Sequence, residues 1–171
     1  MRVLVTGDRG YIGVLMAAGH DIVGLDAGWF DGCDFGTARD GYEQTTGDIR
    51  DAIADDLAGV DAVVYLAAIS NDPVGQLSAL ATYSVNADGA FHRARVAKQA
   101  RMRRFLLSSS CSLYRAAGNA AVAEEEEFHP VAPCDAAQRG LTARICACSS
   151  GSRNCLSIPP FHSMTTQGLH S

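Results

Sequence analysis

The stretch RVLVTGDRGYIGVLMAAGHDIVGLD, residues 2–26, decides the fold. It opens with a β-branched run at residues 2–6 and closes with a second apolar run at residues 21–26, and both are typical of short β-strands. Residues 11–19 between them can form a short helix. The first run is followed by three glycines, Gly7, Gly10 and Gly13. The order strand, glycine turn, helix, strand predicts a βαβ unit with two parallel strands.

The rest of the chain continues this alternation. A short third strand is expected at residues 43–46, after a loop rich in Gly, Asp and Thr, and further strands at 61–66 and 105–109. A long helical stretch runs from about residue 76 to residue 100. This spacing predicts the α/β class: a doubly wound, Rossmann-like parallel sheet with five strands in the order 3-2-1-4-5 and helices on both faces.

The glycine turn carries the strongest chemical signal. Glycines are needed where a chain turns tightly and where a phosphate approaches bare backbone, and the start of the next helix offers unpaired N–H groups to a pyrophosphate. Asp26 closes the second strand. A carboxylate there can accept hydrogen bonds from both ribose hydroxyls and repels a 2′-phosphate, which favours NAD over NADP. The plainer alternative is a glycine-rich turn in which Asp26 only shapes the local backbone.

Composition limits the partners. The chain has 171 residues and a mass of 18.0 kDa, enough for one globular domain. Its net charge of −5 gives no general attraction to nucleic acids or anionic membranes, so a small molecule is the expected partner. The sequence contains neither a bilayer-spanning apolar run nor a signal peptide, which predicts a cytoplasmic protein. Its six cysteines are then expected to be reduced, and their spacing predicts no metal site.

Two further features are interpreted as structural. A basic cluster near the end of the long helix is expected to interact favourably with the helix dipole and to lie in water. No aromatic platform accompanies the cluster, so it is not interpreted as a nucleic-acid site. Trp29 and Phe30 are interpreted as loop packing, with no function assigned. The cluster comprises Arg93, Arg95, Lys98, Arg101, Arg103 and Arg104.

Five motifs, in order along residues 1–133, resemble the extended short-chain dehydrogenase/reductases, the NAD-dependent epimerase/dehydratases of nucleotide sugars. The first is the spacing GxxGxxG at residues 7–13. The others follow in chain order: GDIRD at 47–51 resembles D-[IV]-R-D, YLAA at 65–68 resembles H-[LF]-A-[AG], VNADG at 85–89 resembles VNxxG, and FLLSSSCSLY at 105–114 resembles FxxSSSxxVYG.

This resemblance implies a role for each matching residue. Asp26 binds the ribose of NAD and Ser110 is the catalytic hydroxyl that contacts an oxygen of the substrate, a nucleotide sugar. Asp48 and Ile49 border the adenine. The residues implied to hold the pyrophosphate are Gly7, Gly10, Tyr11, Ile12 and Gly13, and those implied to lie beside the ribose and nicotinamide are Leu66, Ala67 and Ala68.

The chain departs from the family where Y-x-x-x-K is expected, because Cys134 and Gln138 stand at the positions of the tyrosine and lysine. A neighbouring cation lowers the pKa of a phenol or thiol, so that the group can give up its proton and take one back. Without that cation, the pKa is not lowered in this way. We therefore expect an epimerase/dehydratase with impaired catalysis; the alternative is a catalytically silent NAD-binding or remnant protein.

Residues 1–133 are expected to form the NAD-binding domain, without a complete substrate domain. Residues 134–171 are expected to form an atypical tail with no strand. The composition of this tail suggests translation in a shifted frame, which is tested by reading the neighbouring frame for Y-x-x-x-K after Pro133. An apolar outer edge of the sheet predicts a homo-oligomer.

Overall fold

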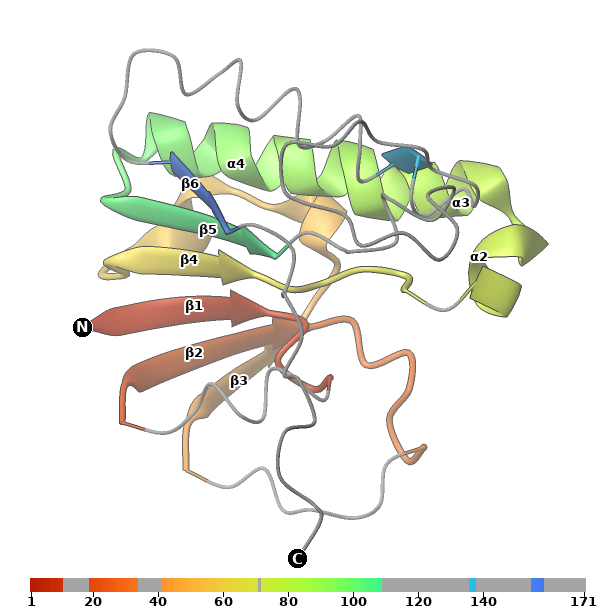
Figure 1. Cartoon of the computed structure of the whole chain (residues 1–171). Helices are drawn as coiled ribbons and strands as arrows, with labels where there is room; N and C mark the ends of the chain where they lie inside the picture. Colours follow the sequence, from red (N-terminus) through yellow and green to blue (C-terminus); the bar gives the residue numbers. More distant parts are fainter. Residues whose placement is uncertain (11–18, 34–40, 71, 109–135, 138–154, 159–171) are drawn as a thin grey trace, which may run out of the picture.

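The computed structural model describes residues 1–10, 19–33, 41–70, 72–108, 136–137 and 155–158. These residues form a parallel sheet with the order β3-β2-β1-β4-β5-β6 (Figure 1). The strands are β1 (Arg2–Thr6), β2 (Asp21–Asp26), β3 (Glu43–Thr46), β4 (Ala62–Tyr65), β5 (Arg104–Ser108) and β6 (Cys155–Ile158). The predicted fold class and the order of the first five strands are confirmed.

The sixth strand corrects the expectation of five strands and of no strand beyond Pro133. β6 pairs with β5 in parallel, with Leu106 opposite Leu156. Its sequence, CLSI, is only four residues long and contains Cys and Ser, so neither its length nor its composition separates it from a loop. It is long-range pairing with β5, which local sequence does not encode, that distinguishes this segment as a strand.

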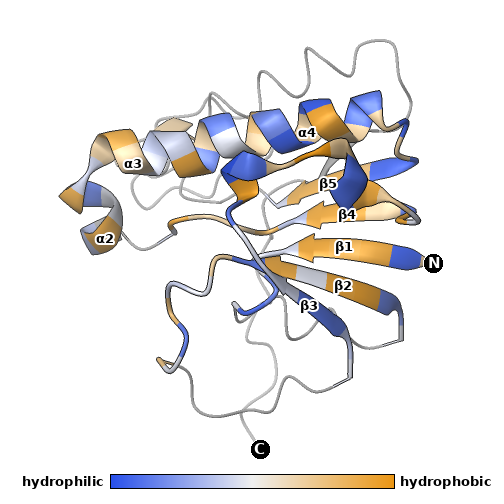
Figure 2. Cartoon of the chain, turned by 180° about the vertical axis from the view of Figure 1, so that it is seen from behind, coloured by the Kyte–Doolittle hydropathy of each residue, from blue (hydrophilic) through white to orange (hydrophobic). Residues whose placement is uncertain are grey.

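Both faces of the sheet are apolar. Leu4 on β1 and Val63 on β4 belong to the larger core cluster, which α4 (Ala90–Gln99) joins through Val96 and Ala97. Val3 and Val5 belong to a second cluster, which includes residues of β2 and β4. Side chains alternate between faces along a strand, so two apolar faces are typical of a central parallel sheet. Figure 2 shows the hydrophobic colouring along β1, β2 and β4 and the hydrophilic outer strand β3.

The helical stretch expected from about residue 76 to residue 100 is divided into several pieces. Ser78 separates the first two helices, and its hydroxyl accepts a hydrogen bond from the Ala81 N–H at 3.2 Å, as a helix N-cap does. A π-helical turn then leads into α4. The helical elements are η1 (Ile49–Asp51), η2 (Ala54–Leu57), α2 (Asp72–Leu77), α3 (Ala79–Tyr83), η3 (Ser84–Gly89) and α4. No helix in the described part of the chain is long and apolar enough to cross a membrane.

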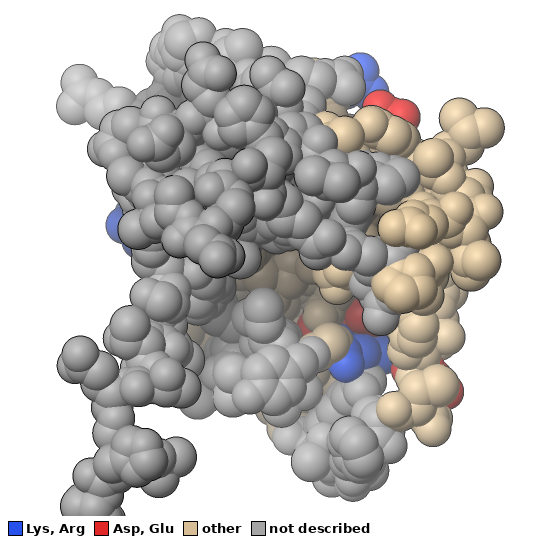
Figure 3. Space-filling view, turned by 45° about the vertical axis from the view of Figure 1, so that its right-hand side comes forward, with Lys and Arg blue, Asp and Glu red and all other residues tan. Residues whose placement is uncertain are grey.

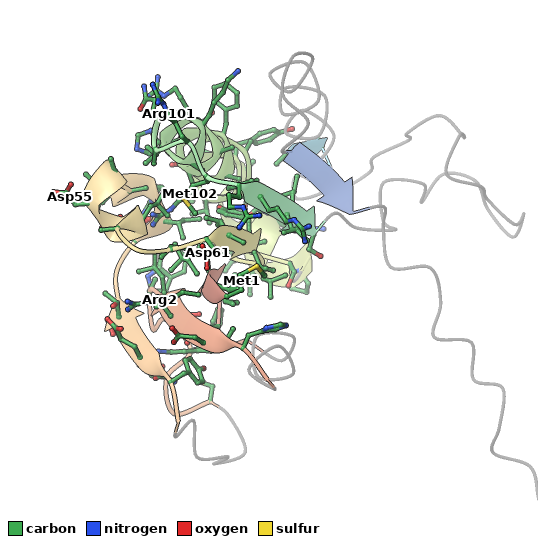
Figure 4. All side chains as sticks on the ribbon, turned by 90° about the vertical axis from the view of Figure 1, so that its left-hand side faces the viewer. Met1, Arg2, Asp55, Asp61, Arg101 and Met102 are labelled. Atoms are coloured by element: carbon green, nitrogen blue, oxygen red, sulfur yellow. The ribbon has the colours of Figure 1, made fainter. Side chains whose placement is uncertain are left out.

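The amino-terminal ends of β1 and β4 are joined by polar contacts. The Arg2 N–H donates to the Asp61 carboxylate at 2.9 Å, and the Asp61 N–H donates to the Arg2 carbonyl at 2.8 Å. Figure 4 views the molecule from this end, where Met1, Arg2 and Asp61 lie close together. The carboxyl ends of the strands lie on the opposite side, which leaves them available for a site.

Arg93 corrects the expectation that the basic cluster lies in water. Its side chain is 1% exposed, and its Nη1 donates to the Asp56 carboxylate at 3.1 Å. Burial lowers the pKa of Arg93, and the charge of Asp56 opposes that shift. A single arginine within a basic run can face the core because its position on the helix is set by the 3.6-residue period, not by its neighbours in sequence.

Replacing Asp56 with alanine is expected to reduce the free energy of unfolding by about 2 kcal/mol, because the buried Arg93 guanidinium loses its counter-charge and the Ile53 N–H loses its acceptor at 3.0 Å. This is below the usual range for buried pairs since the Asp56 side chain is 38% exposed and water screens the interaction. Urea denaturation measures the change, with Asp55→Ala on the same turn as the control. Arg93→Met added to Asp56→Ala is expected to recover stability; equal effects of the Asp55 and Asp56 variants would contradict this assignment.

Candidate functional site

An open cleft of about 430 Å³ lies at the carboxyl ends of β1, β2 and β4. Crevices at this end of an open parallel sheet, where strand order reverses, are the usual ligand sites of the fold. Figure 3 shows a hollow in this face, with acidic and basic atoms next to one another. The cleft is lined by Gly7, Arg9, Gly10, Asp26, Ala27, Trp29, Phe30, Asp31, Asp48, Ile49, Leu66, Ala67, Ala68, Ile69, Ser70 and Val85.

Gly7 makes the turn that forms the floor of the cleft. Its φ of +74° lies in the left-handed region, and its N–H donates to the Leu25 carbonyl at 2.8 Å. A Cβ at this position would lie 2.9 Å from the backbone N and Cα of Ala67, closer than real Cβ contacts allow. Gly10 closes the turn by donating its N–H to the Gly7 carbonyl at 3.0 Å. Only glycine therefore lets the loops after β1 and β4 meet here.

Asp26 lies at the end of β2 and lines the cleft. Its Oδ1 accepts a hydrogen bond from the Gly28 N–H at 2.7 Å, which fixes the direction of the carboxylate. Its backbone carbonyl accepts from the Gly47 N–H at 2.9 Å, so the loop after β3 is held beside it. The chain thus places an oriented acidic group on the β2–β3 side of the glycine turn, as the sequence predicted.

Asp48 and Ile49 border the same side of the cleft at the start of η1. Asp48 accepts hydrogen bonds from the backbone N–H and the Nε of Arg50, both at 2.9 Å. The Arg50 hydrogen bond lowers the pKa of Asp48, which keeps this carboxylate ionised. Ile49 is 6% exposed and belongs to the larger core cluster, so it anchors this wall in the core.

The opposite wall is the loop after β4. The Leu66 N–H donates to the Thr6 carbonyl at 3.1 Å, which continues the pairing of β4 with β1. Asn86, on η3 and 2% exposed, holds the far part of this wall: its Oδ1 accepts from the Ile69 N–H at 2.8 Å and its Nδ2 donates to the Ile69 carbonyl at 2.9 Å. A buried amide that satisfies both backbone groups of one residue fixes that loop segment.

The loop after β2 was misinterpreted at Trp29 and Phe30. The two residues are 55% and 63% exposed and line the cleft, so they are not packed into the protein as expected. Arg9, between two glycines of the turn, was also missed as a site residue. Its Nη1 donates to Asp31 and its Nη2 donates to the Thr46 hydroxyl, each at 2.6 Å. The sequence signal that could have identified Arg9, Trp29 and Phe30 is their place just after a predicted strand, because residues that follow parallel strands meet at one edge of the sheet.

Asp8 belongs to the same turn but is not among the residues that line the cleft. It is 1% exposed, and its carboxylate would overlap a Cβ on Gly24 of β2, at 2.2 Å. The Tyr42 hydroxyl donates to its Oδ2 at 3.1 Å, whereas Oδ1 has no hydrogen-bond partner among the described residues. Burial raises the pKa of Asp8, and the nearby charge of Asp26 raises it further.

Asp8→Asn is expected to raise the free energy of unfolding at pH 7, because burial raises the pKa of the Asp8 carboxyl in the native state and makes its charged form unfavourable there. The native state holds the Asp8 proton more tightly than the unfolded chain, so the charged carboxylate costs stability at neutral pH and less as pH falls towards 4. Urea denaturation at both pH values checks this, with the exposed Asp21→Asn as the control. A gain that persists unchanged at pH 4 would contradict the cause given.

The structure brings together every predicted site residue that it describes. All eight line the one cleft: Gly7, Gly10, Asp26, Asp48, Ile49, Leu66, Ala67 and Ala68. The predicted roles of Tyr11, Ile12, Gly13 and Ser110 concern positions outside the described residues, as do those of Cys134 and Gln138.

Comparisons with known proteins identify the family and the fold. The sequence profile of the "NAD dependent epimerase/dehydratase family" matches residues 3–155, past the last motif quoted above. No curated protein sequence matches the chain. Among solved structures, a UDP-glucose 4-epimerase from Brucella ovis in complex with NAD has a TM-score of 0.77 at 20% identity, covering 91% of this chain and 50% of that one.

Two dehydratases are similar to the same degree. TunA, an NAD-dependent NDP-hexosamine 5,6-dehydratase involved in tunicamycin biosynthesis, has a TM-score of 0.77 at 22% identity, with 88% of this chain and 50% of that chain covered. DesIV, a dTDP-glucose 4,6-dehydratase from Streptomyces venezuelae solved with NAD and TYD, has a TM-score of 0.76 at 24% identity, with 92% and 54% covered. The chain therefore spans about half the length of these structures and shares their fold.

Proposed function

Because this chain belongs to the NAD dependent epimerase/dehydratase family, we propose that its cleft binds NAD. The observation that carries the proposal is the convergence, in one cleft of about 430 Å³, of the Gly7 turn, the oriented Asp26 carboxylate and the Leu66–Ala68 segment. The residues fit a dinucleotide: the turn at Gly7 and Gly10 has no side chains to keep a pyrophosphate from the backbone, a carboxylate serves a ribose, and an apolar segment serves a ring. The volume is within the range of small-molecule sites.

The residues divide the cleft between the two halves of the cofactor. Asp26, Asp48 and Ile49 lie on the β2–β3 side of the glycine turn and are proposed to hold the adenosine half. Leu66, Ala67 and Ala68 follow β4 on the other side and are proposed to hold the nicotinamide half. The turn between them, with Gly7 and Gly10 and the following Tyr11, Ile12 and Gly13, is proposed to hold the pyrophosphate.

We propose a nucleotide sugar as the substrate, which is supported by the family and by the sugar-nucleotide enzymes among the similar structures. When bound, NAD supplies a hydride acceptor for a sugar carbon. Ser110 is proposed to donate a hydrogen bond to the substrate oxygen. The proton of that substrate oxygen would be moved by the family's tyrosine, aided by the charge of its lysine. Cys134 stands in place of the tyrosine phenol and Gln138 in place of the lysine cation. Loss of positioned acid/base catalysis costs roughly 10² to 10⁴ in rate, so we propose NAD binding with severely slowed turnover.

Isothermal calorimetry with NAD tests the binding proposal. Turnover is then assayed by incubating the NAD-loaded protein with UDP-glucose or dTDP-glucose and separating the products by chromatography, with Ser110→Ala as the comparison. We expect binding of NAD and little or no product. Product formation that Ser110→Ala abolishes would overturn the impaired catalysis, and absence of NAD binding would overturn the proposal as a whole.

We also propose that the chain self-associates. β6 pairs only with β5 among the described strands, and an outer strand with unpaired backbone groups is a template for a second copy. Sedimentation is expected to show species larger than the 18.0 kDa chain. A single monomeric species at micromolar concentration would contradict this proposal.

A further inference from the structure

Two aromatic side chains stand exposed on one wall of the cleft. Trp29 and Phe30 are 55% and 63% exposed, which is unusual for large apolar groups whose burial would be favourable. They lie three and four residues after Asp26, on the turn that Gly28 begins with a φ of +70°. Both line the same cleft as Asp26, Asp48 and Ile49. Their position therefore offers flat apolar surface on the adenosine side.

Arg9 holds the turn that carries this aromatic pair. Its guanidinium donates through Nη1 to Asp31, which follows Phe30, and through Nη2 to the hydroxyl of Thr46 at the end of β3, both at 2.6 Å. The Arg9 side chain is only 15% exposed, although Asp31 is 55% exposed. One planar fork thus ties the loops that follow β1 and β2 to the end of β3. We call Arg9, Asp31 and Thr46 the clamp.

A second contact at the base of the turn supports the clamp. The Gly28 N–H donates to the Asp26 carboxylate, and the Asp31 N–H donates to the Gly28 carbonyl at 3.2 Å. A Cβ on Gly28 would lie 2.9 Å from Nη1 of Arg9, so the guanidinium packs directly against this turn. The turn is therefore fixed at both ends, and Trp29 and Phe30 lie between the fixed points.

We propose, resting on the NAD-binding function above, that Arg9 is a positioning residue whose clamp holds Trp29 and Phe30 as an aromatic wall against the adenine base. Trp29 and Phe30 line the cleft together with Asp26, Asp48 and Ile49, the residues proposed to hold the adenosine half. Stacking of a base on an aromatic ring changes affinity by roughly tenfold or more. Stacking on an ordered wall increases the affinity more than stacking on a mobile one, because the ordered side chains lose less conformational entropy on binding.

Trp29 is the only tryptophan in the chain, so its fluorescence reports on the wall itself. Adenine stacked on the indole is expected to quench emission excited at 295 nm. The test titrates the full chain with AMP, which carries the adenine half, and with nicotinamide mononucleotide, which carries the other half. AMP is expected to reproduce most of the quench given by NAD, and nicotinamide mononucleotide is expected to give little.

Variants of the clamp separate positioning from direct contact with phosphate. Thr46→Val and Asp31→Ala leave the Arg9 charge in place but remove one arm of the clamp each. Both are expected to weaken AMP binding by about fivefold to tenfold and to reduce the quench at saturation. The matched control is Thr45→Val, one residue earlier on β3, where successive side chains point to opposite faces. This control is expected to bind AMP and quench as the unmodified chain does.

Calorimetry with NAD distinguishes the two levels of the proposal. If NAD gives no binding heat, the proposed function fails and the wall fails with it. If NAD binds but AMP leaves Trp29 emission unchanged, only the wall is overturned. If Thr46→Val and Asp31→Ala behave as Thr45→Val does, or bind AMP more tightly because the guanidinium is released for phosphate, the positioning role of Arg9 is overturned. A reduced saturating quench in both clamp variants supports it, because a loss of stability alone would not change that value.

Discussion

Replacing Gly7 with alanine is expected to cause the largest loss of stability of any single methyl addition in the glycine turn. The φ of +74° costs an L-residue about 1–2 kcal/mol. The new Cβ would also meet the Ala67 backbone at 2.9 Å, and overpacking against rigid neighbours adds about 1–3 kcal/mol. The sum, about 2–5 kcal/mol, is a large part of the stability of a domain of this size.

Gly59→Ala is the matched control, because its φ of +72° is nearly the same and the nearest atom to its Cβ would lie 3.9 Å away. It should lose only the conformational part, about 1–2 kcal/mol. Thermal and urea denaturation of both variants measure the difference. Equal losses would show that the approach of the β4 loop to Gly7 is not what requires glycine here.

Asp26→Asn is expected to have the largest effect on cofactor choice. The unmodified chain should bind NAD more tightly than NADP, because the oriented Asp26 carboxylate accepts the ribose hydroxyl and repels a 2′-phosphate. Asparagine retains an oxygen for the Gly28 N–H, which Asp26 accepts at 2.7 Å, so the local turn is kept while the charge is lost. The preference for NAD should fall by about tenfold or more, since charged hydrogen bonds contribute about 1.5–3 kcal/mol.

Asp21→Asn, at the exposed start of the same strand, is the control for this experiment. It removes the same charge at the far end of β2 and should leave the ratio of the two affinities unchanged. Competitive calorimetry with NAD and NADP gives both ratios. Equal affinities in the unmodified chain, or a ratio that Asp26→Asn does not change, would contradict the role given to Asp26.

Local sequence was enough to predict the central part of the fold. β1 and β2 occupy the predicted residues because each is a short run of β-branched or aliphatic residues with a glycine turn between them. β3 was predicted at Glu43–Thr46 from its place after a loop, although all four of its residues are exposed. The eight described site residues meet in one cleft because all of them follow or close parallel strands, and that rule depends on topology alone.

The remaining features depend on contacts between distant residues. β6 is defined by its pairing with β5, and Arg93 is buried because α4 turns that one position towards Asp56. Trp29 and Phe30 were assigned to loop packing, whereas the Arg9 guanidinium holds their turn through partners 22 and 37 residues away. Such contacts leave no pattern in the local sequence. A side-chain hydrogen bond between two distant segments changes neither the spacing of hydrophobic residues nor the amino-acid composition of either segment.

The central claim is that NAD lies across the glycine turn, between the loops after β2 and β4. Hydrogen–deuterium exchange of the full chain, with and without NAD, locates the ligand directly. The account predicts slower exchange at residues 7–10, 27–33 and 66–70, with no change in the turn at residues 58–61 at the opposite end of the sheet. Protection confined to residues away from these three loops, or none at saturating NAD, would contradict it.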